Sequence, residues 1–76
     1  MNHIRKTLLA AHDQQFLVGV GIGSRHYGDG WVKEVDDETV IIEMVPLFGG
    51  GDIVIALGSI SYVYPYPNSR RTEETK

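Results

Sequence analysis

The chain has 76 residues, a formal net charge of −3, 42% hydrophobic residues and no cysteine, so we expect one small domain without a disulfide framework. A domain of this length buries only roughly 60–65% of its unfolded surface, and in the absence of metal-ligand spacing its stability must come from packing or from association with other chains. Between Thr7 and Tyr66 two basic residues accompany eight acidic ones, and this balance of −6 disfavours contact with the phosphates of nucleic acids.

Residues 2–12 are predicted to form a short helix. Asn2 is a suitable N-cap, and Ile4, Leu8 and Ala11 recur at helical spacing. A helix of about ten residues is only marginally stable in isolation. We therefore expect its apolar stripe to dock on the rest of the domain.

Five short strands are predicted to follow the helix. Their ranges are 15–24, 31–36, 39–45, 53–57 and 60–64. Asp29-Gly30 predicts the first hairpin turn, and residues 37–38 predict the second. Pro65 and Pro67 are expected to end the sheet.

The predicted fold is mainly β: a short N-terminal helix followed by a five-stranded, strongly bent antiparallel small barrel. Glycine at alternate positions of the first strand, 19, 21 and 23, leaves one face without side chains and permits bending or close approach. The barrel domain is expected over residues 1–67, and residues 68–76 form a flexible polar tail. Because no leader and no apolar run of membrane-spanning length stand out, we predict a cytoplasmic location without membrane contact.

Two short motifs and the last strand carry a resemblance to a known family. The stretch 30-GWVKEVD-36 is similar to the first motif of Sm/LSm proteins, in which a glycine and a hydrophobic residue precede an aspartate. The stretch 55-IALGSI-60 looks like the second motif, and 60-ISYVYP-65 resembles the ending of the bacterial Hfq branch. The resemblance covers residues 3–65 and implies an Sm-like (SH3-like) barrel capped by the helix.

The resemblance also implies assembly, because family members form rings of six or seven subunits in which strand four of one subunit pairs with strand five of the next. Either Val54 and Ala56 face a neighbour while Ile53, Ile55 and Leu57 point into the barrel, or the reverse. The alternative is that the N-terminal helix covers the second face within one chain. The predicted subunit interface consists of Val54, Ala56, Ile60, Tyr62 and Tyr64.

The positions that bind RNA in this family hold other residue types here. In Sm proteins an asparagine and an arginine hold a base, and the resemblance places Val40 and Leu57 in these positions. The Hfq branch has lysine and histidine where this chain has Leu57 and Gly58. Valine and leucine cannot read base edges or pair with phosphate. The resemblance therefore supports the scaffold more strongly than RNA binding.

Catalytic, nucleotide and metal sites have little support. The stretch 19-GVGIGS-24 lacks the third glycine and the following helix of a dinucleotide-binding loop. The acids of 36-DDE-38 lie on a turn and point in different directions, so a solvated turn in which Asp36 caps backbone amides is favoured over a cation site. Ser24 and His26 have no evident orienting acid. We predict no catalysis, no metal and no cofactor.

The sequence therefore predicts a non-catalytic, homo-oligomeric Sm-like scaffold or interaction module. The alternative is a divergent single-stranded RNA-binding protein that uses basic residues of the helix and tail. Tyr62, Tyr64 and Tyr66 alternate and project on one face, where packing is favoured over base stacking. The candidate RNA- or partner-binding residues are Arg5, Lys6, Trp31, Asp36, Gly58, Arg70 and Arg71.

Overall fold

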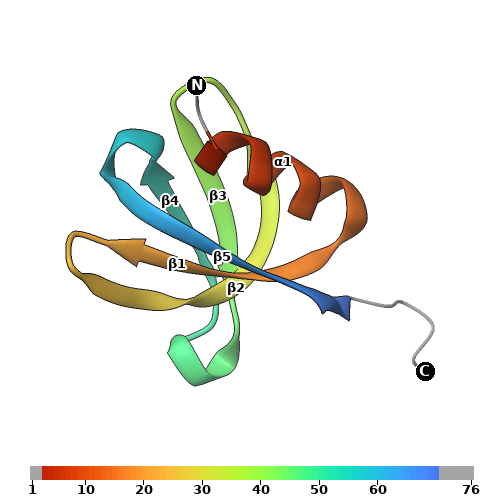
Figure 1. Cartoon of the computed structure of the whole chain (residues 1–76). Coiled ribbons are helices and arrows are strands. Elements are labelled where there is room, and N and C mark those ends of the chain that lie inside the picture. The colour runs from red at the N-terminus through yellow and green to blue at the C-terminus, as the bar shows by residue number, and fades with distance from the viewer. Residues whose placement is uncertain (1–2, 71–76) are drawn as a thin grey trace.

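The computed structural model describes residues 3–70, which form one helix and an antiparallel five-stranded sheet (Figure 1). The helix α1 spans His3–Gln14, and the strands are β1 Phe16–Ile22, β2 Arg25–Val35, β3 Thr39–Met44, β4 Asp52–Ala56 and β5 Ile60–Arg70. Two 3-10 turns, η1 Pro46–Phe48 and η2 Leu57–Ser59, precede and follow β4. Within residues 3–70 no helix has the length and hydrophobicity that crossing a membrane requires.

The strand order is β4-β3-β2-β1-β5, and all neighbouring strands are antiparallel. β4 and β5 are therefore the two edges of the sheet. The prediction of a mainly β fold, with an N-terminal helix and five antiparallel strands, is confirmed. The predicted barrel is not closed, because no ladder joins β4 to β5 in the part of the chain that the structure describes.

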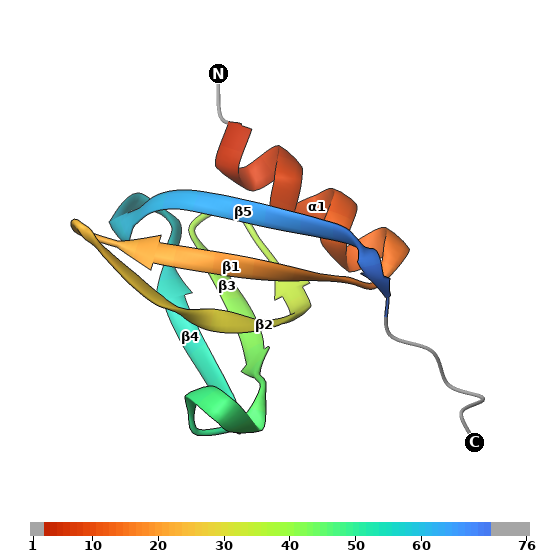
Figure 2. The ribbon, with the colours of Figure 1, turned by 60° about the horizontal axis from the view of Figure 1, so that its bottom comes forward.

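The hydrophobic core lies between α1 and one face of the curved sheet, which we call the inner face. α1 packs against β1, β2 and β5 (Figure 2) and contributes Leu8 and Ala11, which are neighbours on one side of the helix. The sheet contributes alternate residues of its strands, as a sheet with one buried face requires. The core side chains of the sheet and of η2 are Phe16, Val18, Val20, Val32, Val40, Ile42, Met44, Ile55, Leu57 and Ile60.

The first hairpin turn differs from the prediction. It lies at Gly23-Ser24, between β1 and β2, and not at Asp29-Gly30. Gly23 has a φ of 66°, a left-handed conformation that glycine adopts easily. Gly30 lies inside β2, where an added Cβ would be 2.6 Å from the carbonyl oxygen of Glu43. This glycine permits close contact between strands instead of a turn, and β2 is longer than predicted.

The last strand also extends beyond its predicted end. Pro65 and Pro67 do not end the sheet, and β5 continues to Arg70. Proline is tolerated on an edge strand, where its missing N–H faces no neighbouring strand. Residues 68–70 therefore belong to β5 and not to a tail, and residues 71–76 lie outside the described residues.

Candidate functional site

The β4 edge exposes two apolar side chains. Ile55 and Leu57 point into the core, whereas Val54 is 66% exposed and Ala56 is exposed beside it. Of the two orientations that the sequence leaves open, the structure has the one with Val54 and Ala56 outside. α1 covers the inner face and leaves Val54 uncovered, so the alternative in which the helix shields this side chain is wrong.

Backbone donors point to the same edge. The N–H of Leu57 donates to the carbonyl oxygen of Glu38 at 2.8 Å. Hydrogen bonding alternates along an antiparallel ladder, so β4 residues at odd positions bond to β3. The N–H groups of Val54 and Ala56 therefore point away from the sheet, toward a position where another strand can add.

The β5 edge lacks such donors at its two prolines. Pro65 lies opposite Val18 in the ladder between β1 and β5, but it has no N–H to donate. We infer that Pro65 and Pro67 present their nitrogens to the open edge, as proline in a sheet requires. By alternation the N–H of Val63 points to this edge as well. A donor for an additional strand therefore lies before Pro65, at Val63, and none lies at Pro65 or Pro67.

The predicted interface residues on β5 differ in exposure. Tyr62 and Tyr64 are exposed, whereas Ile60 is only 5% exposed. Ile60 follows η2, and its side chain joins the core of its own chain, so its predicted place in a subunit interface is corrected. A hollow of about 260 Å³ adjoins β5 on the side of α1. It is lined by His3, Ile4 and Thr7 of α1 and by Ser61, Tyr62 and Val63 of β5.

The tyrosines of β5 lie over the glycines of β1 on the side of the sheet away from α1, which we call the outer face. The ring of Tyr62 fills the space above Gly21, where an added Cβ would overlap it. Tyr64 and Tyr66 make an edge-to-face contact with their centroids 5.1 Å apart. The bare glycine face of β1 thus lets side chains of the neighbouring strands lie close to its backbone.

A chain of hydrogen bonds crosses this outer face from β2 to β5. Nε2 of His26 lies 2.9 Å from Oδ1 of Asp29, and Nδ1 lies 2.9 Å from the hydroxyl of Tyr62. A carboxylate only accepts, so Nε2 is the donor to Asp29. Nδ1 accepts from the Tyr62 hydroxyl when the ring is neutral and donates to it when the ring is protonated. The rings of His26 and Phe48 also make an edge-to-face contact, with their centroids 6.0 Å apart.

This arrangement is not evident from the sequence. His26 and Asp29 are three positions apart, which in a regular strand places them on opposite faces. The ladder between β1 and β2 contains a bulge in which Tyr27 is the extra residue, and the bulge returns both side chains to the outer face. The sequence signal for this arrangement is glycine at positions 19 and 21, because a strand face without side chains leaves room for the side chains of the neighbouring strands.

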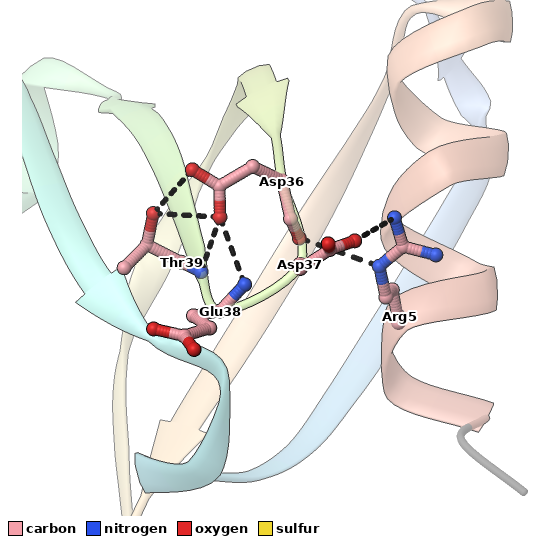
Figure 3. Close-up of polar contacts among 5 residues, drawn as sticks. All are labelled: Arg5, Asp36, Asp37, Glu38 and Thr39. Atoms are coloured by element: carbon pink, nitrogen blue, oxygen red, sulfur yellow. Dashed lines mark hydrogen bonds and ion pairs between the residues drawn. The ribbon is translucent and has the colours of Figure 1, made fainter.

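Asp36 stabilises the turn between β2 and β3 (Figure 3). Its Oδ1 accepts hydrogen bonds from the backbone N–H groups of Glu38 and Thr39, both at 2.8 Å. These bonds, with that from the Thr39 hydroxyl, lower the pKa of Asp36 below its usual value. Arg5 joins α1 to the turn, since its Nε donates to the carbonyl oxygen of Asp36 at 3.3 Å and its Nη2 lies 3.5 Å from Asp37. The predicted capping role of Asp36 is confirmed.

The predicted basic residues are not brought together. Arg5 and Lys6 lie near the start of α1, and Lys6 is exposed. Arg70 donates to Oε1 of Gln14 at the other end of the helix, at 3.2 Å. The rise of an α-helix separates these two ends by roughly 13 Å. Arg71 lies outside the described residues.

The remaining candidates lie on other elements. Trp31 is half-buried on the outer face of β2, opposite Leu17 of β1. Gly58 is exposed in η2. In residues 3–70 no three histidine, aspartate or glutamate side chains gather in a way that could hold a metal ion.

Comparisons with protein-family models, with curated proteins and with solved structures find no match for this chain. The similarity to Sm/LSm proteins therefore stays a prediction from the sequence motifs. The candidate functional surfaces are the β4 edge, the β5 edge and the outer face.

Proposed function

We propose that the protein is a non-catalytic, homo-oligomeric scaffold of the Sm-like kind, in which β4 of one copy pairs with β5 of the next. The observation that carries this proposal is the open sheet with two unlike edges. Edges that expose apolar side chains promote aggregation unless they are paired or covered. Pairing of unlike edges is heterologous and closes into a ring when the rotation between copies allows it. By resemblance, we propose six or seven subunits.

The lengths of the two edges support this pairing. β4 has five residues, and the part of β5 before Pro65, residues 60–64, also has five. Val54 and Ala56 present donors at one edge, and Val63 presents a donor at the other. Pro65 and Pro67 themselves offer no donor. The prolines therefore limit the shared ladder to a segment that matches β4.

The side chains at the two edges also fit one another. In a continuous sheet the exposed Val54 and Ala56 of one copy lie beside Tyr62 and Tyr64 of the next. Cross-strand pairs of β-branched and aromatic residues stabilise a sheet by roughly 0.2–1 kcal/mol each. The hollow between α1 and β5 gives side chains of the neighbour room beside the same edge. Association thus covers apolar surface that α1 leaves exposed.

The proposal is tested by the molar mass of the protein and of Val54→Lys, measured by light scattering after size-exclusion chromatography. We expect the wild type at six or seven times the chain mass of 8.5 kDa. Lysine is a charged edge residue that opposes strand addition, so Val54→Lys should elute as a folded monomer.

Leu47→Lys is the matched control, because it makes the same kind of change at another exposed apolar position. Leu47 is 85% exposed in η1, which lies at the end of the molecule opposite α1 (Figure 2). This variant should assemble like the wild type. A wild type that stays at 8.5 kDa at micromolar concentration, or a Val54→Lys protein that still assembles, would contradict the proposal.

A further inference from the structure

We propose that the outer face around Asp29 binds a cationic side chain, namely an arginine of a basic partner peptide. Three features coincide there: a carboxylate with an unused oxygen, aromatic rings beside it, and the negative charge of the surrounding chain. The surface belongs to β1, β2 and β5 of one copy. It goes beyond the proposed assembly and does not require it.

Asp29 is held close to the sheet in a partly desolvated position. Its side chain is 24% exposed, and its Oδ1 accepts the hydrogen bond from His26. Among the described residues, Oδ2 has no hydrogen-bond partner. Gly19 makes this position possible, because an added Cβ would lie 2.8 Å from Oδ1. A cation at Oδ2 gains more here than at a fully exposed carboxylate, since charge-assisted hydrogen bonds strengthen as water is excluded.

Aromatic rings stand next to this carboxylate. The Tyr66 ring lies 3.4 Å from the Cβ position of Gly19, over which Asp29 also lies. Desolvation and then the negative charge of Asp29 raise the pKa of Tyr66, as expected for two neighbouring groups. Tyr64 is 59% exposed and contacts Tyr66. A guanidinium within about 6 Å of such a ring is attracted to its face.

Charge favours a basic peptide over a nucleic acid on this face. Residues between Thr7 and Tyr66 carry a balance of −6. Lys33, one of the two bases in that stretch, already pairs with Asp52 at 2.9 Å. A nucleotide stacked on Tyr64 or Tyr66 brings its phosphate toward Asp29, where like charges repel. Arginine suits the site better than lysine, because the planar guanidinium can stack on a ring and donate to a carboxylate together.

The test measures binding of a fluorescently labelled, capped heptapeptide with three arginines separated by glycines, by anisotropy at low salt. Matched peptides with lysine or glutamate, and a short single-stranded oligo-U and oligo-A, are measured alongside. We expect saturable binding of the arginine peptide below about 1 mM, weaker binding of the lysine peptide, and none of the glutamate peptide or the RNAs. An RNA that binds more tightly than the arginine peptide would overturn the proposal.

Asp29→Asn is the decisive variant, because asparagine keeps an oxygen for His26 but removes the charge. We expect Asp29→Asn to weaken binding of the arginine peptide about tenfold, as expected for the loss of one charge-assisted hydrogen bond. Asp13→Asn is the control: it removes the same charge from an exposed site at the end of α1, and its effect should stay within twofold. Equal binding by the two variants would refute the site.

Tyr64→Ala gives a second test if Asp29→Asn fails to fold. Tyr64 is exposed, so its truncation should leave the fold intact and should weaken binding of the arginine peptide several-fold. Unchanged binding by Tyr64→Ala would count against the proposal. Because the proposed assembly places Val54 and Ala56 of a neighbouring copy beside Tyr64, the monomeric Val54→Lys protein should bind the arginine peptide at least as tightly as the wild type. This result distinguishes failure of this site from failure of the assembly.

Discussion

The two faces of β1 are built in opposite ways. On the inner face Val18 and Val20 are completely buried in the core with α1. On the outer face Gly19 and Gly21 bring no side chain, and groups from β2 and β5 occupy the space above them. The inner face therefore gains its stability from apolar burial, whereas the outer face depends on shape and hydrogen bonds around bare backbone. The outer face of β1 therefore keeps polar and aromatic groups of its neighbouring strands available for binding.

The largest expected effect lies on the inner face, at Leu8 of α1. Its side chain is 0% exposed, so Leu8→Ala leaves a cavity and should lower the free energy of unfolding by about 3 kcal/mol. Denaturant unfolding measures this change. The control is Leu47→Ala in the exposed η1, with an expected change below about 0.5 kcal/mol. Similar losses in both variants would mean that α1 does not cover the core.

A smaller effect is expected on the outer face, at Gly21. An added methyl group overlaps the ring of Tyr62, so Gly21→Ala must displace that ring and should destabilise the fold by about 2 kcal/mol. Gly58→Ala is the control, because nothing lies within 4 Å of its Cβ position. A neutral Gly21→Ala variant would show that Tyr62 does not lie over β1.

The contribution of the outer-face hydrogen bonds to stability can be measured by variants that keep the shape of the side chains. Tyr62→Phe removes the hydroxyl that bonds to His26 and should cost about 1 kcal/mol or less, since this bond is partly exposed to water. Tyr64→Phe removes a hydroxyl that has no hydrogen-bond partner among residues 3–70, and its stability should not change. Chemical denaturation of the two variants distinguishes them. An equal loss in both would contradict the chain from Asp29 to Tyr62.

The smallest effect concerns the turn at Asp36, which belongs to neither face of β1. The pKa of Asp36 is lowered in the folded protein, so its charge stabilises the fold at pH values above the pKa that this carboxyl has in the unfolded chain. This stabilisation is lost as the pH falls through the pKa of Asp36 in the folded protein. Asp36→Asn should therefore melt lower than the wild type at neutral pH, and the difference should shrink below about pH 4. A difference that does not shrink as the pH falls below this value would contradict this assignment.

Local sequence patterns predicted the elements that depend on local spacing. Leu8 and Ala11 marked the buried side of α1, and the β-branched run of β3 marked a strand that ends one residue before its predicted end. The turn at Asp29-Gly30 was wrong because the close contact of Gly30 with β3 is not visible in local sequence. The extension of β5 through Pro65 was missed because only the strand order shows that β5 is an edge.

The candidate surfaces were predictable to different degrees. The motif resemblance pointed to Val54 and Ala56, but their orientation was fixed only by the pairing of β4 with β3. His26 and Asp29 were not grouped in advance, because the bulge at Tyr27 changes which face each residue takes. A bulge depends on the register of two strands, which alternation within one strand does not reveal.

The most direct test of edge pairing is amide hydrogen exchange at Val54 and Val63 in the wild-type protein. By the alternation of the two ladders, both N–H groups are expected to point to an open edge in a single copy. If β4 of one copy pairs with β5 of the next, both amides exchange slowly at concentrations where the protein assembles, and Val63 exchanges fast in Val54→Lys. Fast exchange of both amides in concentrated wild-type protein would show that the edges stay unpaired.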